Sequence, residues 1–424
     1  MGPLAPNIRR RMPVVVDRRL LLLPILLCLS IAACSDPSPA IDAEGPASRT
    51  GDAPTYSSLE SFVADYWIRP IPAQGPAPAD WPEVEASLLP EACGTCHTQK
   101  LADWSTTIHA GAYSAGLSGQ LVNWEQSSPE TVRSCLVCHA PLAEQSAWVG
   151  GTDGDLSPNP TFDRDLRDRG ITCAACHLRG RQRYGPVLRD GSAGSFPPEA
   201  PHNGANRTEF FSDSRFCSGC HQFEAPAPAG KSIQNTYQEW RVSRWADEGV
   251  SCQDCHMPDR RHLWRGIHDL EMVRSALSTE WLDGPGIRLR LTNSGAGHHF
   301  PTYVTPEVVV EITQLGVDRT ALESRPASWL VARKVENRDG LWVELSDTRI
   351  GVDEAVSFEV DALPGAKFAR ATITVRPDAV YSSVFAQFLR GSLPDTSRVL
   401  LSEAAGAAGN SPFVIFDETV PITR

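Results

Sequence analysis

The chain has 424 residues, of which 21% are charged, and a formal net charge of −12 at pH 7. An acidic protein of this kind is not expected to bind nucleic acid, because the phosphate backbone attracts basic surfaces. An acidic surface favours basic or neutral partner proteins instead. The most informative part of the composition is the 12 cysteines.

The first 33 residues have the pattern of a secretory signal peptide. Arg18 and Arg19 precede an apolar run over 20–33 that is too short to span a membrane permanently. The run ends in Ile-Ala-Ala-Cys, which resembles a bacterial lipobox, so Cys34 is expected to carry a lipid that binds the membrane. An ordinary signal peptide with an incidental cysteine is the alternative. The protein is therefore predicted to be exported and anchored in the bacterial envelope, on the periplasmic face or at the cell surface.

Residues 34–85 are rich in proline and alanine, and we expect them to form a tether. In the following segment, over 86–278, glycine and proline loops alternate with short predicted helices at 101–114, 163–169 and 236–247. The last of these helices begins with Thr-Tyr-Gln-Glu, a capping-box sequence in which Glu239 would bond back to the helix start.

Residues 86–278 also contain five copies of Cys-X-X-Cys-His, the attachment signal for c-type haem. The two thiols can bond to the two vinyl groups of a haem, and the histidine supplies the proximal nitrogen to its iron. Zinc knuckles do not require a histidine directly after each second cysteine, and a disulfide framework does not repeat one spacing five times. The motifs thus predict five covalently attached haem c groups, bound through Cys93, Cys96, Cys135, Cys138, Cys173, Cys176, Cys217, Cys220, Cys252 and Cys255, with proximal ligands His97, His139, His177, His221 and His256.

Histidines outside the motifs are candidates for the sixth iron ligand. An iron bound by one histidine has an open position that decides between electron transfer and catalysis. His299 is next to a stronger candidate and is expected to point elsewhere. Because five candidates match five irons, the simplest interpretation is bis-histidine coordination throughout. The predicted distal ligands are His109, His202, His262, His268 and His298.

From residue 279 to 424 the sequence changes to an alternating pattern. Ile287, Leu289 and Leu291 alternate with polar residues, as in a half-buried strand. Further strands are predicted up to 398–402, and a helix at 377–390. The predicted fold class is α+β, with a loop-rich, mostly helical pentahaem domain over 86–278 and a C-terminal antiparallel β-sandwich-like domain over 279–424.

Segments around the motifs resemble the cytochrome c554-like multihaem cytochromes. They are Trp104–Ala110, Glu239–Ser243 followed by Gly249–Pro258, and Gly297–Thr302, so the resemblance covers about residues 90–305. It implies electron relay through closely stacked, mostly bis-histidine haems, and it supports the distal roles assigned above, most directly those of His109 and His298. Some members have one five-coordinate haem. Pentahaem nitrite reductases typically carry a Cys-X-X-Cys-Lys motif, whereas all five motifs here end in histidine.

The sequence therefore predicts an exported pentahaem c-type cytochrome lipoprotein that transfers electrons through mostly bis-histidine haems. The alternative is a multihaem oxidoreductase with one open iron that acts on a small nitrogen or sulfur compound. A third interpretation adds assembly with a partner through the β-rich part. No catalytic residue is assigned, and an electron carrier is favoured over an enzyme.

Overall fold

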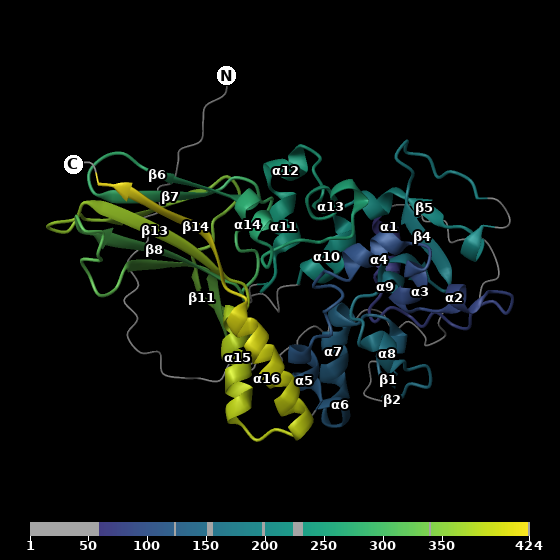
Figure 1. Ribbon diagram of the computed structural model, residues 1–424. Coiled ribbons are helices and arrows are strands. Elements are labelled where there is room, and N and C mark those ends of the chain that lie inside the picture. Colours follow the sequence, from purple (N-terminus) through teal and green to yellow (C-terminus); the bar gives the residue numbers. More distant parts are fainter. Residues whose placement is uncertain are drawn as a thin grey trace.

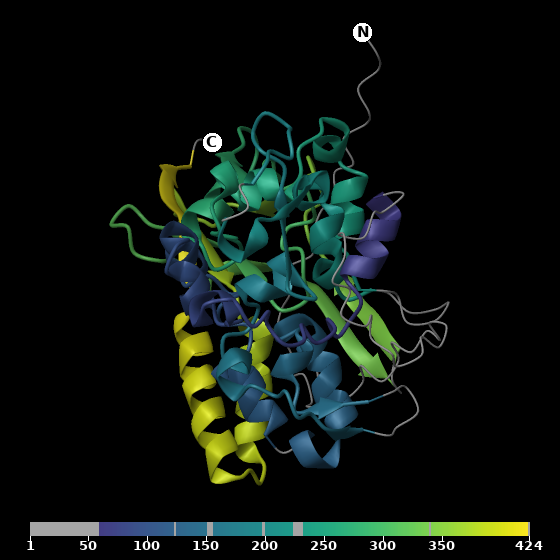
Figure 2. The same cartoon turned by 90° about the vertical axis from the view of Figure 1, so that its right-hand side faces the viewer.

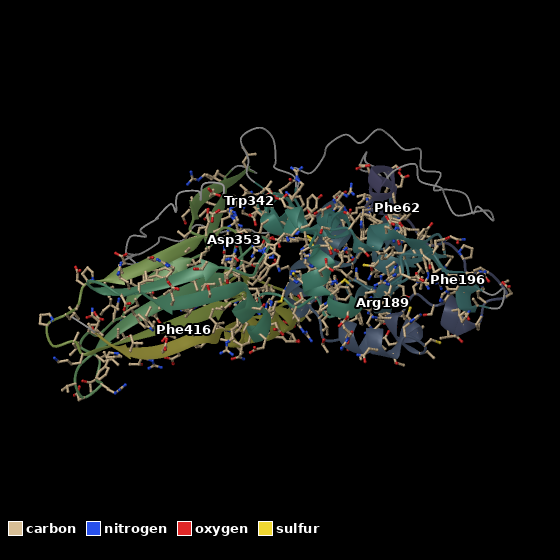
Figure 3. All side chains as sticks on the ribbon, turned by 90° about the horizontal axis from the view of Figure 1, so that it is seen from above. Phe62, Arg189, Phe196, Trp342, Asp353 and Phe416 are labelled. Atoms are coloured by element: carbon tan, nitrogen blue, oxygen red, sulfur yellow. The ribbon has the colours of Figure 1, made fainter. Side chains whose placement is uncertain are left out.

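The computed structural model describes residues 59–122, 124–150, 156–196, 200–223, 232–338 and 341–422. The predicted signal peptide, Cys34 and the first part of the tether lie outside these residues. A part made of short helices lies beside a part made of antiparallel sheets (Figure 1). Seen from above, Phe196 and Phe416 lie towards opposite ends of this elongated arrangement, with Trp342 and Asp353 between them (Figure 3). Within the described residues, no helix is long and apolar enough to cross a membrane.

The helices of the first part are mostly one or two turns long. Proline at the first turn begins α3 and α7, and the Asp163 side chain caps α8 by accepting from Leu166 N. Small sheets accompany them: β1 (Trp148–Val149) with β2 (Ser157–Pro158), and β3 (Leu178–Arg179), β4 (Gln182–Pro186) and β5 (Asn206–Thr208), where β4 and β5 run parallel. The helices are α1 (Leu59–Tyr66), α2 (Glu83–Ala86), α3 (Pro90–Gly94), α4 (Thr98–Trp104), α5 (Ala115–Leu121), α6 (Trp124–Ser127), α7 (Pro129–His139), α8 (Arg164–Arg167), α9 (Cys173–His177), α10 (Arg215–His221), α11 (Thr236–Arg241), α12 (Arg244–Asp247), α13 (Cys252–His256) and α14 (Leu270–Ala276).

The described end of the predicted tether is packed against the motif-bearing helices. Phe62, Tyr66 and Ile71 are buried, and the Tyr66 hydroxyl donates to the carbonyl of Cys176 at 2.8 Å. The backbone N–H of Ile71 donates to the Pro141 carbonyl, also at 2.8 Å. The proline-rich composition predicted a tether, but residues 59–85 pack against these helices instead. Burial of their aromatic side chains stabilises the packed arrangement.

Two of the predicted helices are shorter than expected. The helix predicted over 101–114 ends at Trp104, and the one over 236–247 is divided between α11 and α12. The capping box predicted at Glu239 is wrong: Asn235 is the N-cap, without a side-chain cap, and the Glu239 carboxylate faces the β part.

The β part consists of antiparallel sheets, of which the two larger ones share one apolar core. Alternate residues of β7 are buried, as predicted, and Leu289 and Phe358 from one sheet pack in the same cluster as Val310 and Ile373 from another. The sheet orders are β12-β7-β6, β14-β13-β8-β9 and β10-β11. The strands are β6 (Leu277–Trp281), β7 (Ile287–Asn293), β8 (Glu307–Leu315), β9 (Ala327–Val331), β10 (Arg333–Arg338), β11 (Leu341–Asp347), β12 (Ala355–Val360), β13 (Phe368–Arg376) and β14 (Phe413–Pro421).

A helical hairpin interrupts the β part between β13 and β14. It consists of α15 (Ala379–Arg390), close to the predicted helix, and α16 (Asp395–Asn410). The strand predicted over 398–402 is wrong because Leu401, Ala404 and Ala408 form one buried stripe of α16 at helical spacing. Figure 2 shows the hairpin beside the helices of the motif-bearing part, and α16 packs against α5.

Two glycines of α5 permit this contact. A Cβ added at Gly116 would lie 2.5 Å from the Phe385 ring, and one at Gly119 would lie 2.9 Å from Leu401 Cγ. Gly116→Ala is therefore expected to lower the free energy of unfolding by about 1–3 kcal/mol, although alanine normally stabilises a helix. The matched control is Gly406→Ala in α16, where a Cβ meets nothing within 4 Å and a gain of about 0.5–1 kcal/mol is expected. Denaturant unfolding of the holoprotein measures both; a gain at Gly116 would contradict the close packing.

Candidate haem sites

Each Cys-X-X-Cys-His motif forms a single helical turn. In four motifs the histidine is the last residue of its helix, at the ends of α7, α9, α10 and α13. In the first motif the turn continues beyond α3, because the N–H of His97 donates to the Cys93 carbonyl at 2.9 Å. Residues i, i+3 and i+4 share one face of a helix, so the two thiols and the imidazole lie together. This is the arrangement that covalent attachment of haem requires.

Three motif histidines face a histidine from elsewhere in the chain. The ring centroids are 6.1 Å apart for His177 and His262, with an interplanar angle of 23°. They are 6.4 Å apart for His256 and His298, at 10°, and 6.2 Å apart for His109 and His221, at 51°. An iron between two imidazoles needs about 2 Å for each metal–nitrogen bond, plus roughly one ångström from each nitrogen to its ring centre, so the expected spacing is roughly 6 Å. The three pairs fit that geometry.

Hydrogen bonds fix the orientation of most of these imidazoles. In six histidines of the described chain Nδ1 meets a backbone carbonyl, which places the proton on Nδ1 and leaves the Nε2 lone pair to bind a metal. His221 differs, because its Nδ1 lies 3.1 Å from the Gln234 side-chain amide. The Nδ1-to-carbonyl distances are 2.8 Å from His139 to Ala112, 2.8 Å from His177 to Tyr184, 2.8 Å from His202 to Gly204, 2.7 Å from His256 to Arg265, 3.1 Å from His262 to Arg260 and 3.0 Å from His298 to His299.

The electrostatic environment also favours the neutral imidazole. Burial lowers the pKa of His109 to about 3, and it lowers the pKa values of His221 and His262 to about 4. A neutral imidazole is the form that binds a metal.

His202 lies in the neighbourhood of the first motif. Its backbone N–H donates to the Glu85 carboxylate, and the Glu85 carbonyl accepts from Arg183 at 2.7 Å. The Arg183 guanidinium is near enough to Cys93 to act on its thiol electrostatically. The structure therefore brings His202 towards the motif that ends at His97, although no ring contact of the described residues joins the two histidines.

His268 and His299 face carboxylates. Nε2 of His268 lies 3.1 Å from both oxygens of Asp378, and Nδ1 of His299 lies 3.6 Å from Glu239. Among the described ring contacts, no motif histidine lies opposite His268. Its predicted role as a distal ligand stays a prediction, as does that of His202.

Thiols of different motifs lie close enough to shift one another's pKa, which orders the motifs in space. Cys93 and Cys173 are such a pair, so the first motif lies beside the third. Cys176 interacts electrostatically with both thiols of the fourth motif. The two thiols of that fourth motif have different neighbours: Cys217 lies near Cys252 of the fifth motif, and Cys220 lies near Cys138 of the second. The order is thus first, third, fourth, fifth, with the second motif beside the fourth.

The fifth motif borders a cavity of about 270 Å³. Cys255 and His256 line it together with the apolar side chains of Leu263 and Met272 and with charged side chains that include Arg265 and Asp269. The thiol and the imidazole are the donors that a haem needs, and Leu263 and Met272 offer an apolar contact to its ring.

Sequence reasoning missed three residues that hold the distal histidines. The Trp264 ring lies 4.8 Å from His109 and 5.0 Å from His262, edge-on to both. Asp103 and Glu239 bind the backbone beside distal histidines. A tryptophan two residues after a candidate ligand was a signal in the sequence, whereas the carboxylates act across distances that the sequence does not reveal.

Comparisons with known proteins agree with this geometry. The family model described as cytochrome c554 and c-prime matches residues 92–178, which hold the first three motifs. A cytochrome c-552 from Aliarcobacter butzleri is 25% identical over 187 residues, which span 41% of this chain and 36% of that relative's length. The crystal structure of a penta-heme cytochrome c552 from Thermochromatium tepidum has the same fold, with a TM-score of 0.56 and 18% identity over 80% of this chain and all of that one.

The expected resemblance is confirmed, and so are the coarser parts of the fold prediction, namely mixed helix and sheet with antiparallel sheets. The boundary predicted at residue 279 stays a prediction, although β6 begins at Leu277. The motifs, their paired histidines and the three comparisons together show that this chain is similar to the multihaem c-type cytochromes, which transfer electrons by means of covalently bound haem c.

Proposed function

We propose that this chain is an exported pentahaem cytochrome lipoprotein that relays electrons through mostly bis-histidine irons. Haem c, when bound, supplies reversible one-electron iron chemistry. The spacing of 6.1–6.4 Å between the three histidine pairs is the observation that carries the proposal.

The residues of the chain hold each site and connect it to the next. At most of the sites a backbone carbonyl keeps the Nδ1 proton in place, so that Nε2 points to the iron. Successive motifs lie close together, with their thiols near one another, which is what transfer over short distances needs. Cys96 and Cys255 are exposed, whereas Cys135 is buried, so the first and fifth motifs are the natural ends of the relay.

Export and anchoring form the second half of the proposal. Support comes from the signal peptide pattern and the lipobox-like sequence at Cys34. The acidic composition favours basic or neutral redox proteins as partners, with the β part as a further assembly surface. Mass spectrometry of the mature protein tests this directly: cleavage before Cys34 and the mass of an acyl group are expected, and an unmodified amino terminus would contradict the anchor.

Low-temperature EPR of the oxidised protein tests the relay. If every iron has two histidine ligands, five low-spin ferric signals and no high-spin signal are expected. The pyridine haemochrome assay on the same sample counts the haems independently.

One observation favours the oxidoreductase as the second candidate. Among the described ring contacts, no imidazole lies opposite His139, whose Nδ1 is bound by the Ala112 carbonyl. The second motif lies next to the fourth and outside the series formed by the other motifs. An open iron there would allow a small nitrogen or sulfur compound to bind. A high-spin EPR signal that shifts on addition of nitrite or hydroxylamine would support this function over the carrier.

A further inference from the structure

We infer that two buried carboxylates, Asp103 and Glu239, are positioning residues that hold the distal histidines His262 and His298 in place. The inference rests on the proposed bis-histidine ligation and identifies the groups that maintain it. Each carboxylate belongs to a helix distant in sequence from the histidine that it serves, and each accepts a backbone N–H at or beside that histidine.

Glu239 of α11 fixes the peptide bond between His298 and His299. Its Oε2 accepts the N–H of His299 at 3.1 Å, while the carbonyl of the same peptide unit, that of His298, accepts from the Asn293 side chain at 2.8 Å. Both polar groups of this peptide are therefore held. Because the next carbonyl, that of His299, accepts the Nδ1 proton of His298, the position of the ring follows from the position of the backbone.

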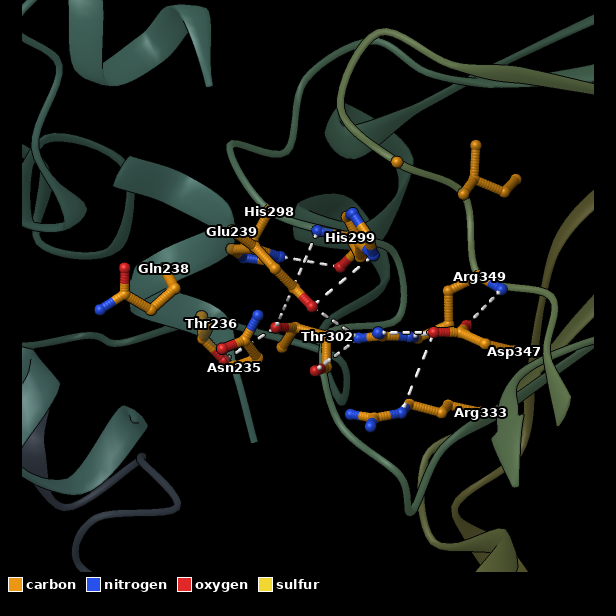
Figure 4. A network of polar contacts seen from close by, with 12 residues as sticks. Asn235, Thr236, Gln238, Glu239, His298, His299, Thr302, Arg333, Asp347 and Arg349 are labelled. Carbon is orange, nitrogen blue, oxygen red and sulfur yellow. Dashed lines mark hydrogen bonds and ion pairs between the residues drawn. The ribbon is translucent and has the colours of Figure 1, made fainter. Parts of the chain in front are cut away.

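Arg349 keeps the Glu239 carboxylate in place (Figure 4). The guanidinium donates to Glu239 Oε1 at 3.0 Å and to the Thr302 carbonyl at 3.1 Å, and both charged side chains are only 4% exposed. Asp347 binds the other side of the guanidinium at 2.8 Å. A carboxylate buried with such partners can adopt few other positions, so it gives the 298–302 loop a fixed attachment point.

Asp103 of α4 does the same for His262. It is 2% exposed, and its Oδ2 accepts the N–H of His262 at 3.0 Å. Arg261 donates to both of its oxygens, and Gln99 donates to Oδ1 at 2.9 Å. The hydrogen bonds from Arg261 hold the pKa of the Asp103 carboxyl well below its usual range. The same combination thus occurs twice: a buried carboxylate, an arginine, and a backbone N–H at or next to a distal ligand.

The test compares Glu239→Gln and Asp103→Asn in the mature holoprotein. Each amide keeps the size of the side chain but replaces one accepting oxygen with a donating NH2 group, which would face the arginine, the backbone N–H or both. For Glu239→Gln we expect the EPR signal of the iron between His256 and His298 to shift or become high-spin, with a shift in its midpoint potential. Asp103→Asn should affect only the iron between His177 and His262.

The matched control is Asp353→Asn. Asp353 also joins the two parts of the molecule, through Arg244 of α12 at 2.8 Å, but this pair is exposed and binds no distal histidine. It should leave every EPR signal and potential unchanged. Glu239→Asp, which keeps the charge but shortens the side chain, provides the same readout if haem incorporation falls in the Gln variant.

His262→Ala and His298→Ala test the ligation of iron separately from the positioning role of the carboxylates. If they leave the number of low-spin irons unchanged, the ligation itself is wrong. If each removes one low-spin signal while Glu239→Gln and Asp103→Asn alter only thermal stability, the ligation holds and the positioning role is overturned. Selective shifts at the two named irons support the positioning role.

Discussion

Replacing His109 with alanine is expected to convert one of the low-spin irons to high spin. The His109 ring faces His221 of the fourth motif at a centroid distance of 6.2 Å, and Trp264 contacts its edge at 4.8 Å. Alanine removes the imidazole that faces His221 and would supply the sixth ligand. EPR should show one low-spin signal fewer, and the potential of that iron should rise because a nitrogen donor is lost.

The control for this prediction is His268→Ala. His268 also follows the fifth motif and was predicted as a distal ligand, but its Nε2 contacts Asp378 at 3.1 Å. If that contact persists in the mature protein, all low-spin signals should remain. A loss of one signal in His268→Ala would restore His268 as a ligand and show that the contact with Asp378 is replaced when haem binds.

Local signals were sufficient to predict the motifs and the two structural classes. A Cys-X-X-Cys-His sequence contains its whole geometry within one helical turn, and the alternation around Leu289 reports a strand buried on one face. Each of these features depends on neighbours a few residues apart. The cysteines and the histidine of each motif could therefore be predicted without knowledge of the fold.

Interactions between segments that are far apart in the chain could not be predicted from the sequence. Glu239 has the sequence position of a capping residue, but its carboxylate meets Arg349, which lies 110 residues further along the chain. His109 was a predicted ligand, yet its pairing with His221 depends on how the turns after α4 lie against the end of α10. The 398–402 segment reads as a strand on its own, and the packing of α16 against α5 and α15 favours the helix. In each case tertiary packing decides between local alternatives that the sequence leaves open.

Removing the fourth motif should interrupt the relay, whereas removing the second should not. The double variant Cys217→Ala with Cys220→Ala loses the thiols that lie near Cys252 and Cys138. The first and third motifs are then separated from the fifth. In Cys135→Ala with Cys138→Ala, the connected order of the other four motifs is preserved. Both variants should contain four haems by mass spectrometry and the haemochrome assay, in place of five.

The kinetics of reduction distinguish the two variants. A protein-sized electron donor has access to the exposed ends of the relay, near Cys96 and Cys255, and not to the buried Cys135. After rapid mixing with limiting donor, the wild type and the second-motif variant should equilibrate in a single phase, because electrons reach every remaining iron through adjacent motifs. The fourth-motif variant should show an additional slow phase from the isolated irons. Equal kinetics in the two variants, at equal haem content, would mean that the thiol contacts do not define the path of the electrons.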